Sequence, residues 1–307
     1  MGSSAGIEWP KGTDLDKLVK DAISEEERGK YETELSSYLQ DLLAEVNSRD
    51  PEVVNSHLRT IQDAVSQETG EAVPLLQGGS IRKHTYVDGL SDVDVLAIVN
   101  NSALENESPS RVRDYFADRL RERLPKTTIT VGNLAVTVKF SDGYEIQVLP
   151  ALTTKTGIRI AAADGKEWSN VIRPEKFAQE LTSVNQANGG TVVPVIKLYK
   201  IINSQLPEDV RLSGYHIESL AINAFDGYSG SRSRKDMLLH LADYASNAVL
   251  HPIEDSTGQS IHVDDNLGGV NSPERERTSA SIKRIVARMK SAESEAQVDQ
   301  WKHLMGD

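Results

Sequence analysis

The chain has 307 residues, with 34 Lys and Arg against 46 Asp and Glu, so its formal charge is −12. It has no cysteine, which excludes a disulfide framework, a thiolate metal site and a cysteine nucleophile. The acidic balance disfavours activation by DNA or RNA, because surfaces that follow phosphates need clustered Lys and Arg. The first ten residues have no basic segment followed by an apolar one, and no apolar run reaches the roughly 18–20 residues of a membrane span. We therefore expect a cytoplasmic protein without a membrane partner.

The first half of the chain changes from a helical to a strand period. A helix is expected from near Asp14, and apolar residues at three- and four-residue spacing predict helices over 35–46 and 54–65. From Val73 onward, short apolar runs bounded by Gly, Ser and Asp indicate strands. The expected strands cover residues 73–80, 92–99, 127–140 and 144–149, with one helix over 111–124.

The second half of the chain is predicted to be helical. Pro174 is suited to the first turn of a helix, and further helices are expected over 192–202, 216–225 and 237–249. A polar loop follows over 251–272, and Ser272 is expected to cap a final helix. These patterns predict an α+β protein with two lobes. Residues 1–165 would form the N-terminal helices and a mixed-sheet catalytic lobe, and residues 166–307 a helical lobe.

One pair of neighbouring motifs predicts a phosphate and metal site. Gly78-Gly79-Ser80 ends a predicted strand, and Asp92-Val93-Asp94 opens the next one. Carboxylates two residues apart on a strand lie on the same face, and among apolar neighbours they need a cation, usually a divalent metal. Glycines followed by a hydroxyl suit the close approach of a phosphate. Either motif alone is usually a simple turn or a solvated strand edge, so it is their combination that predicts a triphosphate held with Mg²⁺ or Mn²⁺.

The ordered series of motifs resembles a known family. It is similar to the polymerase-beta-like nucleotidyltransferase fold and, within it, to bacterial cGAS/DncV-like nucleotidyltransferases, the oligonucleotide cyclases of CBASS anti-phage systems. The resemblance covers roughly residues 55–285. The segments that carry it are Gly79-Ser80, Asp92 to Asp94, Tyr144 to Ala151, Val195 to Asn203, Ser213 to Leu220, and His262 to Gly268.

The resemblance implies a role for each matching residue. Gly79 and Ser80 would hold the donor triphosphate, and Asp92 and Asp94 would bind the metal. Ser213 and Lys197 match positions that contact phosphates, and Tyr215 matches a position near a base; Lys197 also reads as a surface lysine with a buried stem. Arg82 and Lys83 follow the glycine turn and read equally well as phosphate ligands or as exposed loop residues.

The resemblance also implies a reaction. ATP or other nucleoside triphosphates would be joined into a cyclic di- or oligonucleotide when a ribose hydroxyl attacks an α-phosphate. A separate effector would read this second messenger.

The sequence departs from the family at one position. Gln147, directly before Val148-Leu149-Pro150-Ala151, stands where the third catalytic carboxylate is expected, and an amide is a poor proton acceptor. Three interpretations stay open. Glu145, two residues earlier on the same strand face, replaces the missing carboxylate; the site works slowly with two carboxylates; or Gln147 is an isosteric replacement for glutamate that traps bound nucleotide.

Two other functions remain open. The first is a transferase that adds a nucleotide to tRNA, a protein or a small molecule, although the acidic charge weighs against tRNA. The second is a nucleotide-binding protein without catalysis, which Gln147 suggests.

Overall fold

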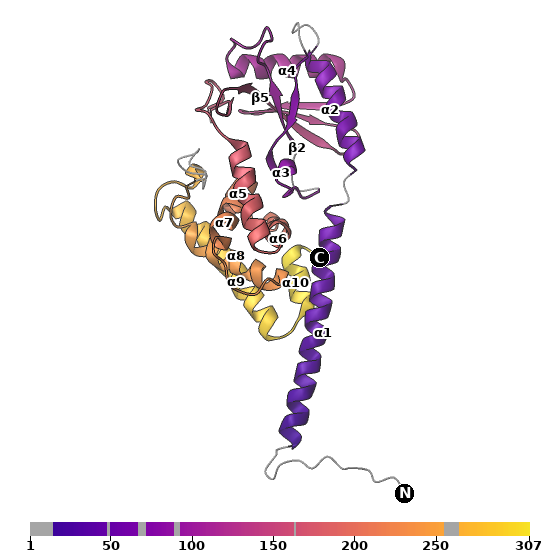
Figure 1. The fold of residues 1–307 in the computed structure, drawn as a ribbon, viewed down its shortest axis with the longest axis vertical. Helices are drawn as coiled ribbons and strands as arrows, with labels where there is room; N and C mark the ends of the chain where they lie inside the picture. The colour runs from indigo at the N-terminus through magenta and orange to yellow at the C-terminus, as the bar shows by residue number, and fades with distance from the viewer. Residues whose placement is uncertain (1–14, 48–49, 67–71, 89–92, 163, 255–263) are drawn as a thin grey trace.

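The computed structural model describes residues 15–47, 50–66, 72–88, 93–162, 164–254 and 264–307. Figure 1 shows two lobes: a sheet with helices packed on it at the top, and a bundle of helices below. The α+β class and the two-lobed arrangement predicted from the sequence are confirmed. None of the described helices combines the length and apolar character that a membrane crossing needs.

The sheet of the upper lobe, called the catalytic lobe here, has the strand order β1-β2-β5-β4-β3, and β6 pairs with β5. β2 and β5 are parallel neighbours, whereas the other pairs are antiparallel. This topology places the strand of Asp94 beside the strand of Gln147. The strands are β1 (Leu75–Gln77), β2 (Val93–Ile98), β3 (Thr128–Val131), β4 (Val136–Lys139), β5 (Glu145–Thr153) and β6 (Ile158–Ile160).

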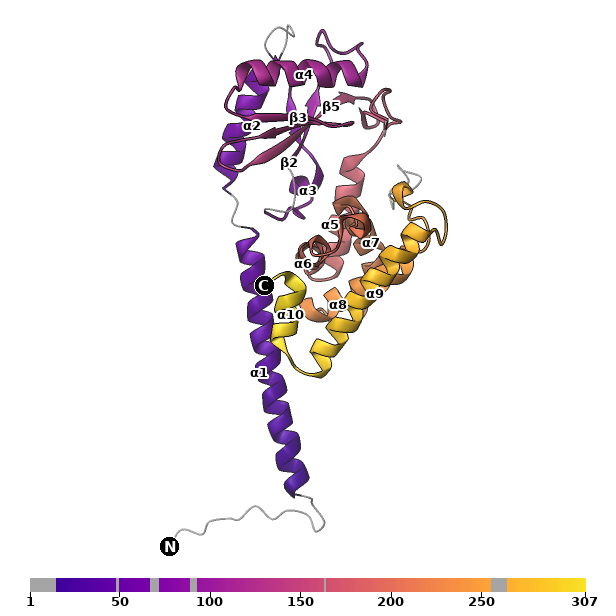
Figure 2. The ribbon, with the colours of Figure 1, turned by 180° about the vertical axis from the view of Figure 1, so that it is seen from behind.

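The two faces of this sheet have different partners because side chains alternate along a strand. Val93 and Val95 of β2 and Val148 of β5 are fully buried in a core with helices α2 (Pro51–Ser66) and α4 (Pro109–Arg123). Figure 2 shows both helices from behind. The residues in between, Asp94 and Gln147 among them, lie on the other face, which is turned toward the helical lobe.

The sequence pattern predicts one strand over 127–140, and this prediction is wrong. The segment forms a hairpin of β3 and β4, closed by a 2.9 Å hydrogen bond from the Gly132 N–H to the Ala135 carbonyl. Alternation continues through both strands, so the sequence pattern hides the turn. The short helix α3 (Gly79–Arg82) and strand β6 are further elements that the sequence analysis does not predict.

The helical lobe is built around α6 and α7, whose side chains are buried on nearly every side. Serine caps begin three of its helices: the Oγ atoms of Ser213, Ser233 and Ser272 each accept a hydrogen bond from the backbone N–H three residues on. The cap predicted at Ser272 is therefore confirmed. The helices are α5 (Pro174–Ala187), α6 (Val192–Ser204), α7 (Gly214–Phe225), α8 (Arg234–Ala248), α9 (Pro273–Ser294) and α10 (Val298–Met305), with 3₁₀ turns at Glu208–Val210 and Asp265–Leu267.

The long N-terminal helix α1 (Leu15–Glu45) packs on the helical lobe. Leu35 and Leu39 belong to the helical core, and the Trp301 Nε1 atom of α10 donates a 2.8 Å hydrogen bond to the Tyr31 hydroxyl. Both views show α1 running alongside α10 (Figures 1 and 2). The sequence patterns place α1 with the catalytic lobe, whereas its apolar stripe is covered by α6, α8 and α10 of the helical lobe. The boundary between residues 165 and 166 stays a prediction.

Candidate functional site

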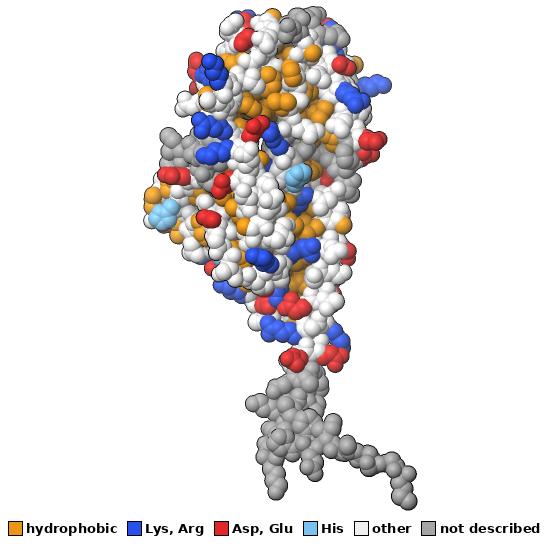
Figure 3. Space-filling model, in the orientation of Figure 1, with side chains coloured by type: hydrophobic (Ala, Val, Ile, Leu, Met, Phe, Trp, Pro, Cys, Tyr) orange, Lys and Arg blue, Asp and Glu red, His pale blue; other side chains and the backbone are white. Residues whose placement is uncertain are grey.

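A cleft of about 850 Å³ separates the sheet from the helical lobe. Its upper wall combines the Gly78–Ser80 turn and Asp94 with apolar side chains such as Leu96 and Leu149. Its lower wall comes from α5, α6 and α7. Figure 3 shows this side of the molecule, with hydrophobic side chains gathered on the upper lobe and charged side chains of both signs where the lobes meet. The volume is in the range that takes a small-molecule ligand.

Asp94 is held against the glycine turn. The Gly78 N–H donates a 2.9 Å hydrogen bond to the Asp94 carbonyl, which extends the β1–β2 pairing into the turn. Gly79 has a φ of +52°, and a Cβ atom built on it would lie 1.8 Å from Asp94 Oδ2. Only glycine allows both this backbone conformation and this approach. The structure thus brings together two of the motifs that the sequence analysis combined.

Gln147 lies in register with Asp94 on the parallel neighbour β5. Residues paired across two strands lie on the same face, so the amide stands beside the Asp94 carboxylate. Glu145 is on the same face of β5 but two residues before Gln147. There it is in register with Lys139 of β4 and forms an ion pair with it. The strand position next to Asp94 is therefore occupied by a neutral side chain. Asp92 lies outside the described residues.

The donor atoms around Asp94 are compatible with a hard cation. A carboxylate and an amide carbonyl are oxygen ligands of the kind that Mg²⁺ prefers. Within the described ranges, no group of three or more His, Asp or Glu side chains gathers as a metal site. The described donors around Asp94 thus bring one negative charge, and the expected roles of Asp92 and Asp94 in metal binding stay predictions.

Ser80 and Tyr215 line the same cleft from its two walls. The Ser80 carbonyl accepts a 2.9 Å hydrogen bond from the Thr85 N–H, which folds the loop after the glycine turn. The half-buried Tyr215 ring packs against Phe177 with a centroid distance of 4.8 Å. Ser213 caps α7 between Leu212 and Gly214, both of which line the cleft. Gly79, Ser80 and Tyr215 are therefore brought to one cavity, with Ser213 at its border.

Lys197 does not share this position. Its Nζ atom donates to the side chain of Asn47, in the turn that follows α1, and burial together with the charge of Lys200 lowers the pKa of Lys197 below its usual value. One helical turn later, Lys200 lines the cleft. The structure thus brings Lys200, rather than Lys197, to the other site residues. Both lysines lie in one apolar helix, so the sequence alone does not separate them.

Four more charged residues of the cleft have no role predicted from the sequence, or only an open one. Glu218 and Arg211 line the cleft together with Arg82 and Lys83. Arg211 is fixed by a 2.6 Å hydrogen bond from its Nε atom to the Leu206 carbonyl. Two features of the sequence could have indicated these residues. Glu218 is a charged residue within the apolar run of α7, and Arg211 is a cation two residues before the Ser213 cap.

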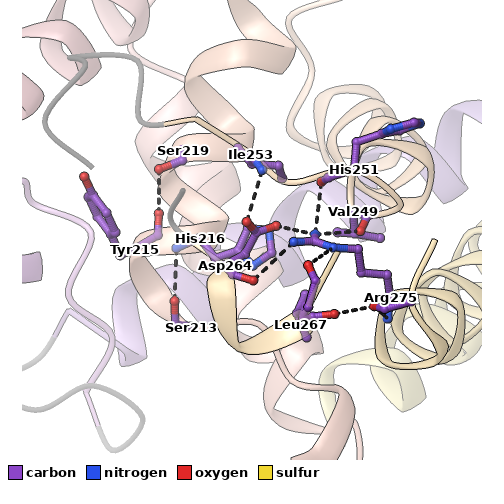
Figure 4. Close-up of polar contacts among 12 residues, drawn as sticks. Ser213, Tyr215, His216, Ser219, Val249, His251, Ile253, Asp264, Leu267 and Arg275 are labelled. Carbon is purple, nitrogen blue, oxygen red and sulfur yellow. Dashed lines mark hydrogen bonds and ion pairs between the residues drawn. The ribbon is translucent and has the colours of Figure 1, made fainter. Parts of the chain in front are cut away.

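An ionic cluster of Arg275, Asp264 and His216 holds α7 from the side away from the cleft (Figure 4). Arg275 and Asp264 are fully buried and form a 2.6 Å ion pair, and His216 Nε2 lies 3.6 Å from Asp264 Oδ2. Burial lowers the pKa of His216 to about 4; Asp264 opposes this shift and Arg275 adds to it. Arg275 also donates to backbone carbonyls: Nη1 to those of Val249 and His251, Nη2 to that of Asp264, and Nε to those of Gly268 and Gly269. This cluster connects Asp264, in the polar loop before α9, to the first turn of α7, which Ser213 caps and which contains Tyr215.

Known structures share this fold. The guanosine triphosphate complex of CdnG from Bradyrhizobium diazoefficiens superposes with a TM-score of 0.67 at 12% identity, covering 88% of this chain and 94% of that one. The STING-associated CdnE c-di-GMP synthase from Capnocytophaga granulosa gives 0.62 at 16% identity, covering 92% and 94%. The DncV cyclic AMP-GMP synthase from Vibrio cholerae, with nonhydrolyzable GTP, gives 0.61 at 13%, covering 96% and 91%. These likenesses confirm the polymerase-beta-like nucleotidyltransferase fold.

A family comparison goes further than the fold. No curated protein sequence matches the chain. The family model of the Second Messenger Oligonucleotide or Dinucleotide Synthetase domain, SMODS, matches residues 30–185, slightly more than half of the chain and all of the described sheet. The chain therefore belongs to the SMODS family of second messenger synthetases, the cGAS/DncV-like nucleotidyltransferases.

Proposed function

We propose that this chain joins nucleoside triphosphates into a cyclic di- or oligonucleotide messenger that a separate effector reads in anti-phage CBASS signalling. The observation that carries the proposal is the cleft itself. Asp94 is pressed against Gly79 on one wall, and Lys200 and Tyr215 face them from the other. The GTP and GTP-analogue complexes of the structural relatives support nucleoside triphosphates as substrates.

Each residue has a defined task in this proposal. The Gly78–Ser80 turn takes the donor triphosphate, because its backbone leaves room for a phosphate next to Asp94. Lys200 offsets phosphate charge, and Tyr215 offers an aromatic face to a base. The two lobes hold the attacking ribose hydroxyl of one nucleotide near the α-phosphate of the other, and this alignment supplies much of the rate.

Mg²⁺ or Mn²⁺ would be held by Asp94, with Asp92 as the second carboxylate and the Gln147 amide oxygen as a weaker ligand. When bound, the ion supplies positive charge to the phosphates. Gln147 leaves the site without a third negative charge. The ion pair with Lys139 holds Glu145 two residues away from the β5 position that pairs with Asp94. This favours slow turnover over full replacement of the carboxylate by Glu145.

The proposal is tested by incubating the protein with all four nucleoside triphosphates and Mg²⁺ or Mn²⁺, followed by mass spectrometry. A cyclic product that resists phosphatase, formed without a third substrate, is expected. A nucleotide bound without any product would instead indicate the second candidate, a binding protein, for which Gln147 is the specific observation. Transfer that requires an added tRNA, protein or small molecule would contradict the proposal.

Two variants separate the interpretations of Gln147. Gln147→Glu and Gln147→Asp restore a carboxylate beside Asp94 and are expected to raise turnover at least about tenfold, because general bases typically contribute 10²–10⁴. Glu145→Gln is the matched control, since it removes a carboxylate from the same strand face. If Glu145 is the replacement carboxylate, Glu145→Gln abolishes turnover and the Gln147 variants gain nothing.

A further inference from the structure

One buried carboxylate connects the two walls of the cleft. Glu218 of α7 is 1% exposed. Its neighbours are Lys83, from the loop that follows α3 in the catalytic lobe, and Lys200, from α6 in the helical lobe. All three residues line the cleft. A fully buried glutamate is unusual unless it is paired, so its partners define its role.

The contacts of Glu218 fix both lysines. Glu218 Oε1 accepts a 2.9 Å hydrogen bond from Lys200 Nζ and another from the Thr85 hydroxyl, while Oε2 accepts from Lys83 Nζ. Lys200 Nζ also donates a 2.9 Å hydrogen bond to the Thr85 carbonyl. An ammonium group has three donors, so Lys200 keeps one for a further ligand.

The cluster carries a surplus positive charge at the cleft. It has two cations and one anion, and none of the other carboxylates in the described ranges forms an ion pair with Lys83 or Lys200. Burial by itself raises the pKa of Glu218, but Lys83 and Lys200 outweigh it and hold this pKa below its usual value. Glu218 is therefore charged at neutral pH and cancels half of the lysine charge.

We propose that Glu218 is a built-in counter-ion: it holds the lysines of the two lobes together while the cleft is empty, and it weakens the hold of the cleft on a triphosphate. This inference rests on the proposed function, because it takes the triphosphate as the anion that competes for the lysines. Glu218 is a positioning residue, since it acts through Lys83 and Lys200.

Opposite effects on affinity follow from this role. Glu218→Gln keeps the shape and removes one negative charge next to the phosphates, so the dissociation constant for the triphosphate is expected to fall by about three- to tenfold. Lys83→Met leaves Glu218 balanced by Lys200 alone, so the dissociation constant is expected to rise by a similar factor. An ion pair that only supports the fold would change affinity in the same direction when either partner is removed.

The experiment measures the affinity of the full chain for a nonhydrolysable ATP or GTP analogue with Mg²⁺ by calorimetry, and the melting temperature with and without it. Glu293→Gln is the matched control: Glu293 Oε1 lies 2.7 Å from the buried Lys235 Nζ, where α8 and α9 meet α1, and outside the cleft. The wild type is expected to melt at a higher temperature with the analogue. Glu218→Gln is expected to melt lower than wild type when empty and to gain more from the analogue, whereas Glu293→Gln gains as much as wild type.

The possible outcomes are distinguishable. Tighter binding by Glu218→Gln together with weaker binding by Lys83→Met supports the proposal. A wild type that binds, with Glu218→Gln unchanged or weaker, overturns the counter-ion role and leaves the proposed function standing. A wild type that binds no triphosphate overturns both. If Glu218→Gln does not fold, Lys83→Met decides, because unchanged or tighter binding by that variant contradicts the role.

Discussion

The side chains of His216 and Glu218 project from opposite sides of α7, because residues two apart on a helix differ by about 200° in direction. Each joins a buried ionic cluster, and the two clusters are built differently. Around Arg275, the guanidinium donors and the Asp264 carboxylate satisfy one another or the backbone. Around Glu218, two lysines share one carboxylate and face a cavity. A closed cluster stabilises the fold, whereas an open one leaves charge for a ligand.

Breaking the closed cluster should have the largest effect on stability. Arg275→Met leaves Asp264 buried without its cation, so the free energy of unfolding is expected to fall by about 3–5 kcal/mol. Urea unfolding followed by circular dichroism measures it. Arg277→Met, with a half-exposed side chain on the same helix, is the control and should change stability by less than about 0.5 kcal/mol. Equal effects of the two variants would show that the Arg275 cluster contributes little.

The closed cluster also predicts a pH dependence. The folded protein keeps His216 neutral down to about pH 4, while an unfolded chain protonates it near 6.5. The contribution of His216 to stability is therefore complete above about pH 6.5 and lost as the pH falls toward 4, by up to about 3 kcal/mol. Unfolding of wild type and His216→Gln between pH 4 and 7.5 measures it, and the wild-type curve should be the steeper. Parallel curves would contradict the buried neutral histidine.

Breaking the open cluster should cost less stability and more binding. In Lys200→Met, Glu218 keeps Lys83 as its partner, so the free energy of unfolding is expected to fall by only about 1–2 kcal/mol. The affinity for a triphosphate should fall at least tenfold, because the cation facing the cleft is lost. Chemical unfolding and calorimetry test the two parts. Lys197→Met is the control on the same helix. If it weakens triphosphate binding as much as Lys200→Met does, the phosphate contact predicted for Lys197 is supported instead.

The last comparison concerns the glycine turn, where strain at positive φ and contact with Asp94 can be separated. Gly79→Ala and Gly143→Ala both place a side chain at positive φ, +52° and +91°, which costs about 1–2 kcal/mol. Only the Cβ atom at position 79 meets Asp94; the one at position 143 has open space around it. Gly79→Ala should therefore reduce Mg²⁺-dependent nucleotide binding strongly, and Gly143→Ala should leave it unchanged. Equal binding by both variants would mean that the placement of Asp94 against Gly79 is not needed.

Local sequence patterns determined much of the secondary structure of this protein. The change from a helical to a strand period predicted the mixed sheet and the helices that follow it, because the burial of one helix stripe or one strand face sets the spacing of apolar residues along the chain. The Ser272 cap and the Gly79–Ser80 turn are likewise local signals. The family resemblance assigned position 147 to the third catalytic carboxylate, and the β2–β5 register then placed Gln147 beside Asp94.

The tertiary structure decided the rest, because these features depend on contacts between distant segments. The apolar stripe of α1 indicates that the helix packs against another surface, but only the structure shows that this surface is the helical lobe. Lys197 and Lys200 have the same type, helix and apolar surroundings, yet one meets Asn47 and the other meets Glu218 and the cleft. The charge balance around Glu218 arises only when the loop carrying Lys83 packs against α7. The sequence thus predicted the glycine turn and the Asp94 strand of the site, and packing determined which charged side chains face the cleft.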